Sequence, residues 1–237
     1  MKKTTIYKKW GVIAAALLTV LAPSTMKAQD KVEVSMGADV VSGYIWRGQD
    51  LGGVSIQPSI SIGKNGFSLT GWGSVGLEST DTKEFDLTLG YSTGGFSIAL
   101  TDYWFNSDEN KYFNYSAHST KHVFETTIGY DFGPLAFVWN TNIAGADGVK
   151  ANGDRAYSSY FEVSAPFKLG DTDCSAELGA TPWENDFYGA SGFAVTNIGF
   201  KVSKEIKITD SFSIPAFAKT TWNPCSEKAY FTFGVSF

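Results

Sequence analysis

The chain is 237 residues long, with a formal net charge of -5 and aromatic residues at 15% of its positions. This negative charge gives no electrostatic support to nucleic-acid binding, so we expect no nucleic-acid partner. Beyond position 28 the sequence has no apolar run of about 18 residues, which excludes a helical membrane protein, and its length fits one domain.

Residues 1–28 have the three parts of a secretory signal peptide. The basic start consists of Lys2, Lys3, Lys8 and Lys9. An apolar segment from Gly11 to Leu21 follows, too short for a good transmembrane helix, and small residues lead up to Ala28. We predict cleavage after Ala28, with Ser24 as the alternative position. Losing residues 1–28 removes five of the 19 basic residues and none of the 24 acidic ones, so the mature chain carries a formal charge of -10.

In the mature chain, twelve segments alternate between apolar and polar residues with the period of a β-strand. A closed barrel of such strands is the one alternative to helices that satisfies every backbone hydrogen bond in lipid. The segments cover roughly residues 31–42, 53–63, 66–77, 83–92, 95–104, 121–131, 134–143, 155–168, 172–181, 192–206, 211–222 and 228–237. We therefore predict an all-β fold, a transmembrane up-and-down antiparallel β-barrel of about 12 strands, in residues 29–237.

Three prolines, Pro58, Pro166 and Pro215, fall inside these segments. Each lacks the N–H group that a strand contributes to its ladder, and a closed barrel offers no free edge for it. We expect a β-bulge at each proline. If a segment were skipped instead, the count would fall to ten or the wall would be partly irregular.

Short and long connections alternate along the chain. The short ones, rich in glycine and polar turn residues, lie at residues 64–66, 93–94, 132–134, 170–171 and 209–210. The longer ones lie at residues 43–52, 105–122, 144–154 and 182–191. Short periplasmic turns opposite longer surface loops are typical of outer-membrane barrels.

The two faces of the segments differ in polarity. Apolar residues such as Ile56, Ile60, Phe85 and Leu87 form the expected lipid face, and Ser55, Gln57, Glu84 and Asp86 lie on the opposite face. Aromatic residues near segment ends are expected to sit among lipid head groups. The predicted outer girdle consists of Tyr44, Trp46, Phe85, Trp104, Phe124, Tyr157 and Trp222. The alternative is a soluble antiparallel barrel or sandwich with its apolar face inside.

The last segment ends the chain on an aromatic residue. Phe231, Phe233, Val235 and Phe237 share one face. We interpret Phe233, Val235 and Phe237 as the membrane-insertion signal that outer-membrane assembly machinery would recognise. Two cysteines, Cys174 and Cys225, fall near opposite rims, too far apart for a disulfide, so two free thiols are expected.

Charged residues on the polar face fall into two groups. The acids are Glu84, Asp86, Glu125, Glu162 and Glu177, and the bases are Lys201, Lys219 and Lys228 from the last three segments. Barrel closure brings the last strand beside the first, which places Arg47 near these bases. Such a separation would create a transverse field that selects small polar solutes. Alternatively, the acids and bases pair across a narrow lumen and plug it, since twelve strands lie between filled and open barrels.

Residues with catalytic potential are few. The two histidines, His118 and His122, lie at the end of the longest loop, close to Ser116 and Ser119. A barrel phospholipase needs a histidine beside a nucleophilic serine, but no G-x-S-x-G turn supports one here. We expect solvated loop residues, no enzyme activity, no metal site and no cofactor.

The first hairpin carries a family resemblance. The run Val40–Gly48 resembles the first-hairpin signature of the TorF-type putative outer-membrane porins, in which an aromatic-x-aromatic-Arg-Gly run leaves the first strand. The positions carried over are Tyr44, Trp46, Arg47 and Gly48. The resemblance implies an outer-membrane barrel for passive solute diffusion. In this interpretation Arg47 either snorkels at the rim or pairs with a lumen acid, and Gly48 permits a strained turn; alternatively the motif only anchors the first hairpin.

Together these features predict a narrow porin-like channel for small hydrophilic solutes in the outer membrane of a Gram-negative cell. Its expected partners are membrane lipids, the outer-membrane assembly machinery and small polar solutes. The second hypothesis is a plugged structural or surface-binding barrel without transport. A barrel phospholipase that uses the His118 loop is the third.

Overall fold

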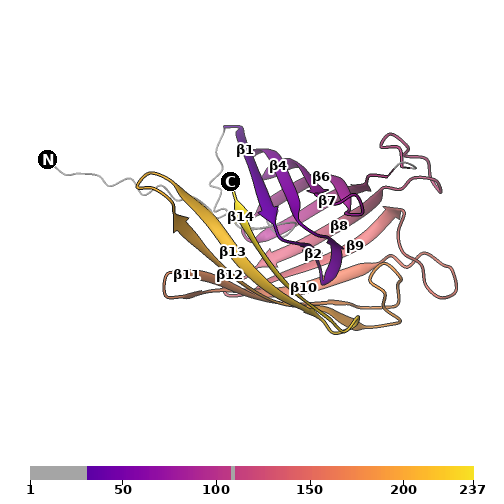
Figure 1. Ribbon diagram of the computed structural model, residues 1–237. Helices are drawn as coiled ribbons and strands as arrows, with labels where there is room; N and C mark the ends of the chain where they lie inside the picture. Colours follow the sequence, from indigo (N-terminus) through magenta and orange to yellow (C-terminus); the bar gives the residue numbers. More distant parts are fainter. Residues whose placement is uncertain (1–30, 108–109) are drawn as a thin grey trace.

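The computed structural model describes residues 31–107 and 110–237, so the predicted signal peptide lies outside the described residues (Figure 1). Twelve antiparallel strands form one closed barrel, as the alternating pattern predicts. The chain between the first and second barrel strands forms a separate two-stranded sheet. The described residues contain no helix long and apolar enough to cross a membrane.

Each barrel strand pairs with its sequence neighbours, and β14 returns to β1. The barrel strands are β1 (Glu33–Val41), β4 (Ser55–Lys64), β5 (Phe67–Gly76), β6 (Lys83–Thr93), β7 (Phe96–Phe105), β8 (Val123–Asp131), β9 (Ala136–Gly145), β10 (Ser159–Leu169), β11 (Thr172–Thr181), β12 (Ala194–Lys207), β13 (Ser213–Asn223) and β14 (Lys228–Ser236). The small sheet consists of β2 (Tyr44–Trp46) and β3 (Gln49–Gly52). We call the end with the short connections, where β1 begins and Phe237 lies, the short-turn end, and the opposite one the long-loop end.

The outward face of the wall is apolar and the inward face is polar. In β4, Ile56 and Ile60 are exposed on the outside, whereas Ser55 and Gln57 are buried on the inside. The alternative in which the apolar face lines the interior is therefore wrong. Because transfer of one such side chain from water to hydrocarbon gains about 1.5–3 kcal/mol, the outer face is suited to lipid.

The three strand prolines do not sit at bulges, so that expectation is wrong. The ladder between β10 and β9 ends before Pro166, and the ladder between β13 and β14 ends before Pro215. At Pro58 the ladder to β5 is interrupted. Each proline thus lies where the ladder to one neighbouring strand is absent, so its missing N–H group costs no hydrogen bond on that side. The register shifts within the barrel occur elsewhere, at Phe124/Glu125 and Gly179/Ala180.

The seam between β1 and β14 is the shortest ladder of the wall. It pairs only residues 39–41 of β1 with residues 234–236 of β14. Beyond Ser42, whose N–H group donates to the Phe233 carbonyl, the chain leaves the wall and forms the β2–β3 hairpin. The part of β14 toward the long-loop end therefore has β13 on one side and no strand on the other.

Candidate functional site in the barrel lumen

The β2–β3 hairpin folds into the lumen at the long-loop end. Its turn residues Arg47 and Gly48 both have positive φ angles, 51° and 80°, as a two-residue type I′ turn requires. A Cβ atom on Gly48 would collide with the backbone of Thr196 on β12, so glycine is needed here for contact as well as for φ. The hairpin tip therefore lies directly against the inner wall.

Arg47 is the centre of the contacts that hold the hairpin. Its guanidinium donates to both carboxylate oxygens of Glu125 on β8, at 2.6 and 2.8 Å, and to the hydroxyl of Tyr188 at 2.6 Å. The hydroxyl of Tyr103 on β7 donates to the same carboxylate at 2.8 Å. The guanidinium also lies 4.8 Å from the ring centroid of Tyr160 on β10. Because the ion pair is buried, loss of one partner would leave an uncompensated charge, at a cost of about 3–5 kcal/mol.

Two further contacts fix the sides of the hairpin. The hydroxyl of Tyr44 donates to Glu84 on β6 at 2.9 Å, and the side-chain amide of Asn223 on β13 donates to the Gly48 carbonyl at 3.0 Å. Asp86, the inward neighbour of Glu84, is buried, and its carboxylate oxygens have no partner among the described residues. The hairpin thus reaches wall strands on several sides and closes this end of the lumen.

A second polar cluster lies on the inner face of β10 to β13. The amide of Asn197 donates to Glu162 at 3.0 Å and to Glu177 at 3.1 Å, and Glu177 forms an ion pair with Lys219. The ammonium of Lys201 lies 4.4 Å from the ring centroid of Phe217. Acids and bases of the lumen therefore meet directly in this cluster.

The inner face is more open toward the short-turn end. Near the hairpin, Ser55 and Ser74 are fully buried, whereas Ser61 and Thr127, farther along the wall, are only half-buried. The lumen is therefore tightly packed at the long-loop end, where the hairpin lies, and has a more accessible polar part toward the short-turn end.

The structure corrects three expectations about the first hairpin. Tyr44 and Trp46 are buried at 2% and 7% exposure on the lumen side, so their assignment to the outer aromatic girdle is wrong. Residues 43–52 form an inward hairpin and not a surface loop. Arg47 does not lie at the rim among the bases, because the hairpin carries it across the lumen to Glu125.

The other predicted lumen charges fall into different surroundings. Five acids and two lysines are inward and lie in the two clusters just described: Glu84, Asp86, Glu125, Glu162, Glu177, Lys201 and Lys219. Lys228 lies exposed at the long-loop end of β14. Their role in a solute path stays a prediction.

Several site residues were missed by the sequence reasoning. Tyr103, Tyr160 and Asn197 project from the polar face, and Tyr188 comes from the loop before β12. Tyr103 and Tyr160 carried a usable signal, because they are large aromatic residues at inward positions of otherwise small or polar rows. Tyr188 gave no such signal in the sequence, since its position in the lumen depends on how the loop before β12 folds.

The histidine loop packs on the outside of the barrel, and the expectation that both histidines are solvated is wrong for His122. His122 is fully buried, and its Nδ1 lies 2.6 Å from an oxygen of Asp102 while its Nε2 lies 2.6 Å from the carbonyl oxygen of Tyr112. Both ring nitrogens are therefore engaged in hydrogen bonds, and neither bonds to Ser116 or Ser119. His122 is therefore not placed as the general base of a phospholipase, whereas His118 lies exposed in the same loop, and the phospholipase hypothesis stays a prediction.

The bend where the hairpin leaves the wall contains three glycines, Gly43, Gly52 and Gly53. Asp81, in the loop after β5, accepts hydrogen bonds from the N–H groups of Gly53 and Glu78, both at 2.9 Å. These two bonds hold the pKa of the Asp81 carboxyl below its usual value of 3.8. The ionised carboxylate thus fixes the bend from the loop after β5.

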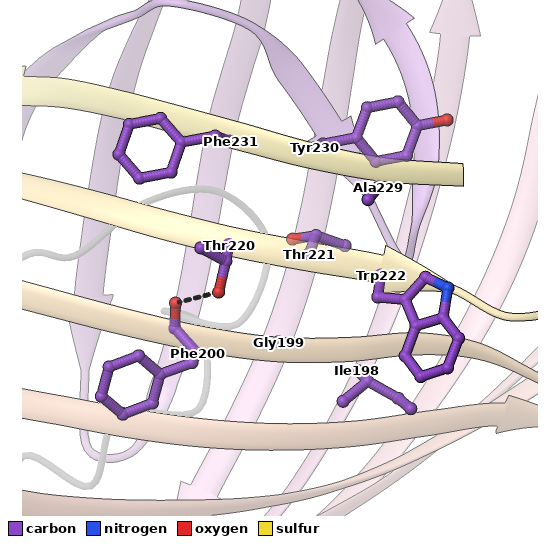
Figure 2. Close-up of a pocket in the computed structure, with 9 residues that line it drawn as sticks. All are labelled: Ile198, Gly199, Phe200, Thr220, Thr221, Trp222, Ala229, Tyr230 and Phe231. Atoms are coloured by element: carbon purple, nitrogen blue, oxygen red, sulfur yellow. Dashed lines mark hydrogen bonds between the residues drawn. The ribbon is translucent and has the colours of Figure 1, made fainter. Parts of the chain in front are cut away.

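A groove of about 460 Å³ lies on the outer face of β12, β13 and β14 (Figure 2). Phe200, Trp222 and Phe231 border it, and its floor contains the smaller residues Thr220 and Ala229. Ala229 and Phe231 belong to the part of β14 that has no strand on its second side.

No protein-family model matches the chain, and no curated protein compared with it does either. The resemblance of the first hairpin to TorF-type porins therefore stays a prediction. Among residues 31–107 and 110–237, no group of three or more His, Cys, Asp or Glu side chains is arranged to hold a metal ion.

Proposed function

We propose that the protein is an outer-membrane diffusion channel for small hydrophilic solutes, closed at its outer end by the β2–β3 hairpin. The observation that carries this proposal is the way the lumen is closed. The hairpin forms its own two-stranded sheet and adds no strand to the wall, so the twelve-stranded barrel is complete without it. A wall with a polar interior and a separate closing element is what a gated channel requires.

The proposed function includes a location in the outer membrane. The apolar outer face and the asymmetry of the connections support an outer-membrane barrel with its short turns in the periplasm. Under this orientation the half-buried polar part of the lumen faces the periplasm, and the hairpin faces the cell exterior.

A specific observation favours a second candidate, a permanently plugged barrel that acts only through its surface. Arg47 and Glu125 form a buried, bidentate ion pair, and aromatic residues pack around it. Such a closed arrangement is stable in itself. The two candidates differ in what happens when the hairpin is released.

Conductance across a planar lipid bilayer separates the two candidates. The wild-type protein is compared with Arg47→Ala and with a variant in which residues 44–52 are replaced by a short glycine linker. We expect rare, brief openings in the wild type and sustained ohmic steps in both variants. Lys168→Ala serves as the control, because Lys168 pairs with Asp173 near the short-turn end, far from the hairpin.

The outcome that overturns the channel is a folded, membrane-inserted linker variant that never conducts. In that case side chains of the wall close the lumen, and the plugged barrel is the better description. Heat-modifiable migration in gels, a property of folded barrels, confirms that each variant is folded before its conductance is measured.

A further inference from the structure

We propose that the β2–β3 hairpin has a second docking position, along the free outer edge of β14, and that it moves between this edge and the lumen. This inference rests on the proposed channel function, because it describes the open position of the gate. It follows from the register of the strands, the bend in the hairpin and the groove beside β14.

The hairpin is a bent continuation of the first wall hairpin. β1 and β4 pair up to Val41 opposite Ser55, and the small sheet resumes with Tyr44 opposite Gly52. Between these pairs the chain bends at Gly43 on one strand and Gly53 on the other. Glycine tolerates many backbone conformations, so this bend can straighten without the strain that side chains would add.

The edge that would receive the straightened hairpin is unpaired. Backbone groups of Phe237 and Phe233 on β14 bond to β1, at Ala38 and Ser42. Every second residue of β14 therefore points its N–H and C=O groups toward the side where β1 lies. Beyond Phe233, the next two residues with this orientation are Phe231 and Ala229. No strand among the described residues pairs with them there. Unpaired strand edges are costly at a membrane and favour addition of another strand.

Continuing the observed register shows which residues would meet. The pairs Asp39↔Ser236, Val40↔Val235 and Val41↔Gly234 extend to Tyr44↔Phe231 and Trp46↔Ala229. Both extended pairs fall at positions where the N–H and C=O groups of β14 are free. The straightened segment would therefore satisfy the backbone groups that the inward position leaves unpaired.

Side chains also fit the second position. Alternation along β1 would turn Tyr44 and Trp46 outward, on the same face as Val40. Trp46 would then stand over the small side chain of Ala229, beside Trp222 in the groove of about 460 Å³ (Figure 2). At this level of the wall an indole ring would lie at the membrane interface, where tryptophan is favoured. Arg47 would at the same time leave Glu125, and the lumen would open.

A disulfide trap tests the second position. In a Cys174→Ala, Cys225→Ser background, we introduce Trp46→Cys with Ala229→Cys and oxidise the folded protein in phosphatidylcholine vesicles. Trp46 now faces the lumen, whereas Ala229 lines the outer groove, so the structure with the hairpin inside does not bring this pair together. In the proposed position their Cα atoms would lie about 5.5 Å apart, which suits a disulfide.

Two matched pairs serve as controls. Asp39→Cys with Ser236→Cys lies in the existing seam and should cross-link in every molecule. Trp46→Cys with Ile198→Cys has its second thiol on the outer face of β12, two strands from β14 at the same level. In the proposed position residue 46 would lie one strand beyond β14, so its Cα atom would be about 14 Å from that of residue 198, which exceeds the reach of a disulfide, and this pair should not cross-link.

We expect the Trp46–Ala229 pair to cross-link in most molecules, and the oxidised protein to conduct continuously until it is reduced. If the seam pair cross-links and the Trp46–Ala229 pair does not, the second docking position is overturned, whatever the conductance of Arg47→Ala. If the cross-link forms but the oxidised protein does not conduct, the hairpin position is supported and the channel function is overturned.

Discussion

The hairpins β6–β7 and β2–β3 are built from the same alternating pattern but are held in place by different forces. β6 and β7 share ten backbone pairs, from Glu84↔Phe105 to Thr93↔Phe96, and each strand also pairs with a second neighbour. β2 and β3 share three pairs and no ladder with the wall. Side-chain contacts, above all those of Arg47, hold them in the lumen, together with one backbone bond at 3.4 Å from the Thr82 N–H group to the Leu51 carbonyl.

This difference indicates which part of the molecule can change shape. A wall strand can move only if two ladders break together, and each broken backbone bond is costly in lipid. The β2–β3 hairpin can leave after a few contacts are broken, because no ladder joins it to the wall, and its own three pairs protect its amides only weakly once it is released. Substitutions that weaken those contacts should therefore free β2–β3 and leave β6–β7 unchanged.

The largest effect is expected for Glu125→Ala. This change leaves the buried Arg47 without its partner and should destabilise the docked hairpin by about 3 kcal/mol or more. Amide hydrogen exchange in residues 44–52 should then accelerate by about 100-fold or more, since each 1.4 kcal/mol is about tenfold. Peptides from β6–β7 should keep their exchange rates. Equal acceleration in both hairpins would show that the two are not independent.

Gly48→Ala should release the hairpin nearly as strongly. The added methyl group meets the backbone of Thr196, and the positive φ of 80° adds about 1–2 kcal/mol of strain. Gly133→Ala is the matched control, because Gly133 also has a positive φ but a Cβ atom there meets nothing within 4 Å. Exchange in residues 44–52 should rise only for Gly48→Ala. A similar rise in both variants would mean that general strain, and not contact with β12, is responsible.

Tyr44→Phe should have a smaller effect. It removes the hydroxyl that donates to Glu84 but keeps the ring, which lies 5.7 Å from that of Trp72. Loss of one hydrogen bond to a carboxylate costs about 1.5 kcal/mol, so hairpin exchange should rise about tenfold. The control is Thr88→Val, which removes a hydroxyl contact to Thr101 inside the β6–β7 ladder. That variant should not change exchange in the hairpin.

The smallest effect is expected at the bend. The pKa of Asp81 is lowered in the folded protein, so its bonds to Gly53 and Glu78 stabilise the fold above the usual value of 3.8 and are lost as the pH falls through the lowered pKa. Exchange at residues 52–54 should therefore rise below about pH 4 in the wild type. Asp81→Asn should show the faster exchange already at neutral pH, and an unchanged rate would remove Asp81 as a support of the bend.

Strand number and strand orientation could be predicted because both depend on local patterns. Alternation along β4 separates Ile56 from Ser55, and the short turns contain residues that accept tight geometry. The prolines were misjudged because their cost depends on the length of the neighbouring strand. Pro166 and Pro215 are tolerated where the ladders to β9 and β14 have already ended, which the local sequence does not reveal.

Local sequence patterns are enough to predict a barrel of about twelve strands with an apolar exterior and a polar interior, because strand periodicity and turn chemistry act over a few residues. The inward turn of the first hairpin becomes visible only in the folded chain, since Tyr44 to Gly48 alternates in the same way whether it extends the wall or leaves it. Tertiary structure also selected Glu125 as the partner of Arg47, 78 residues away, because ion pairing depends on which side chains meet in space.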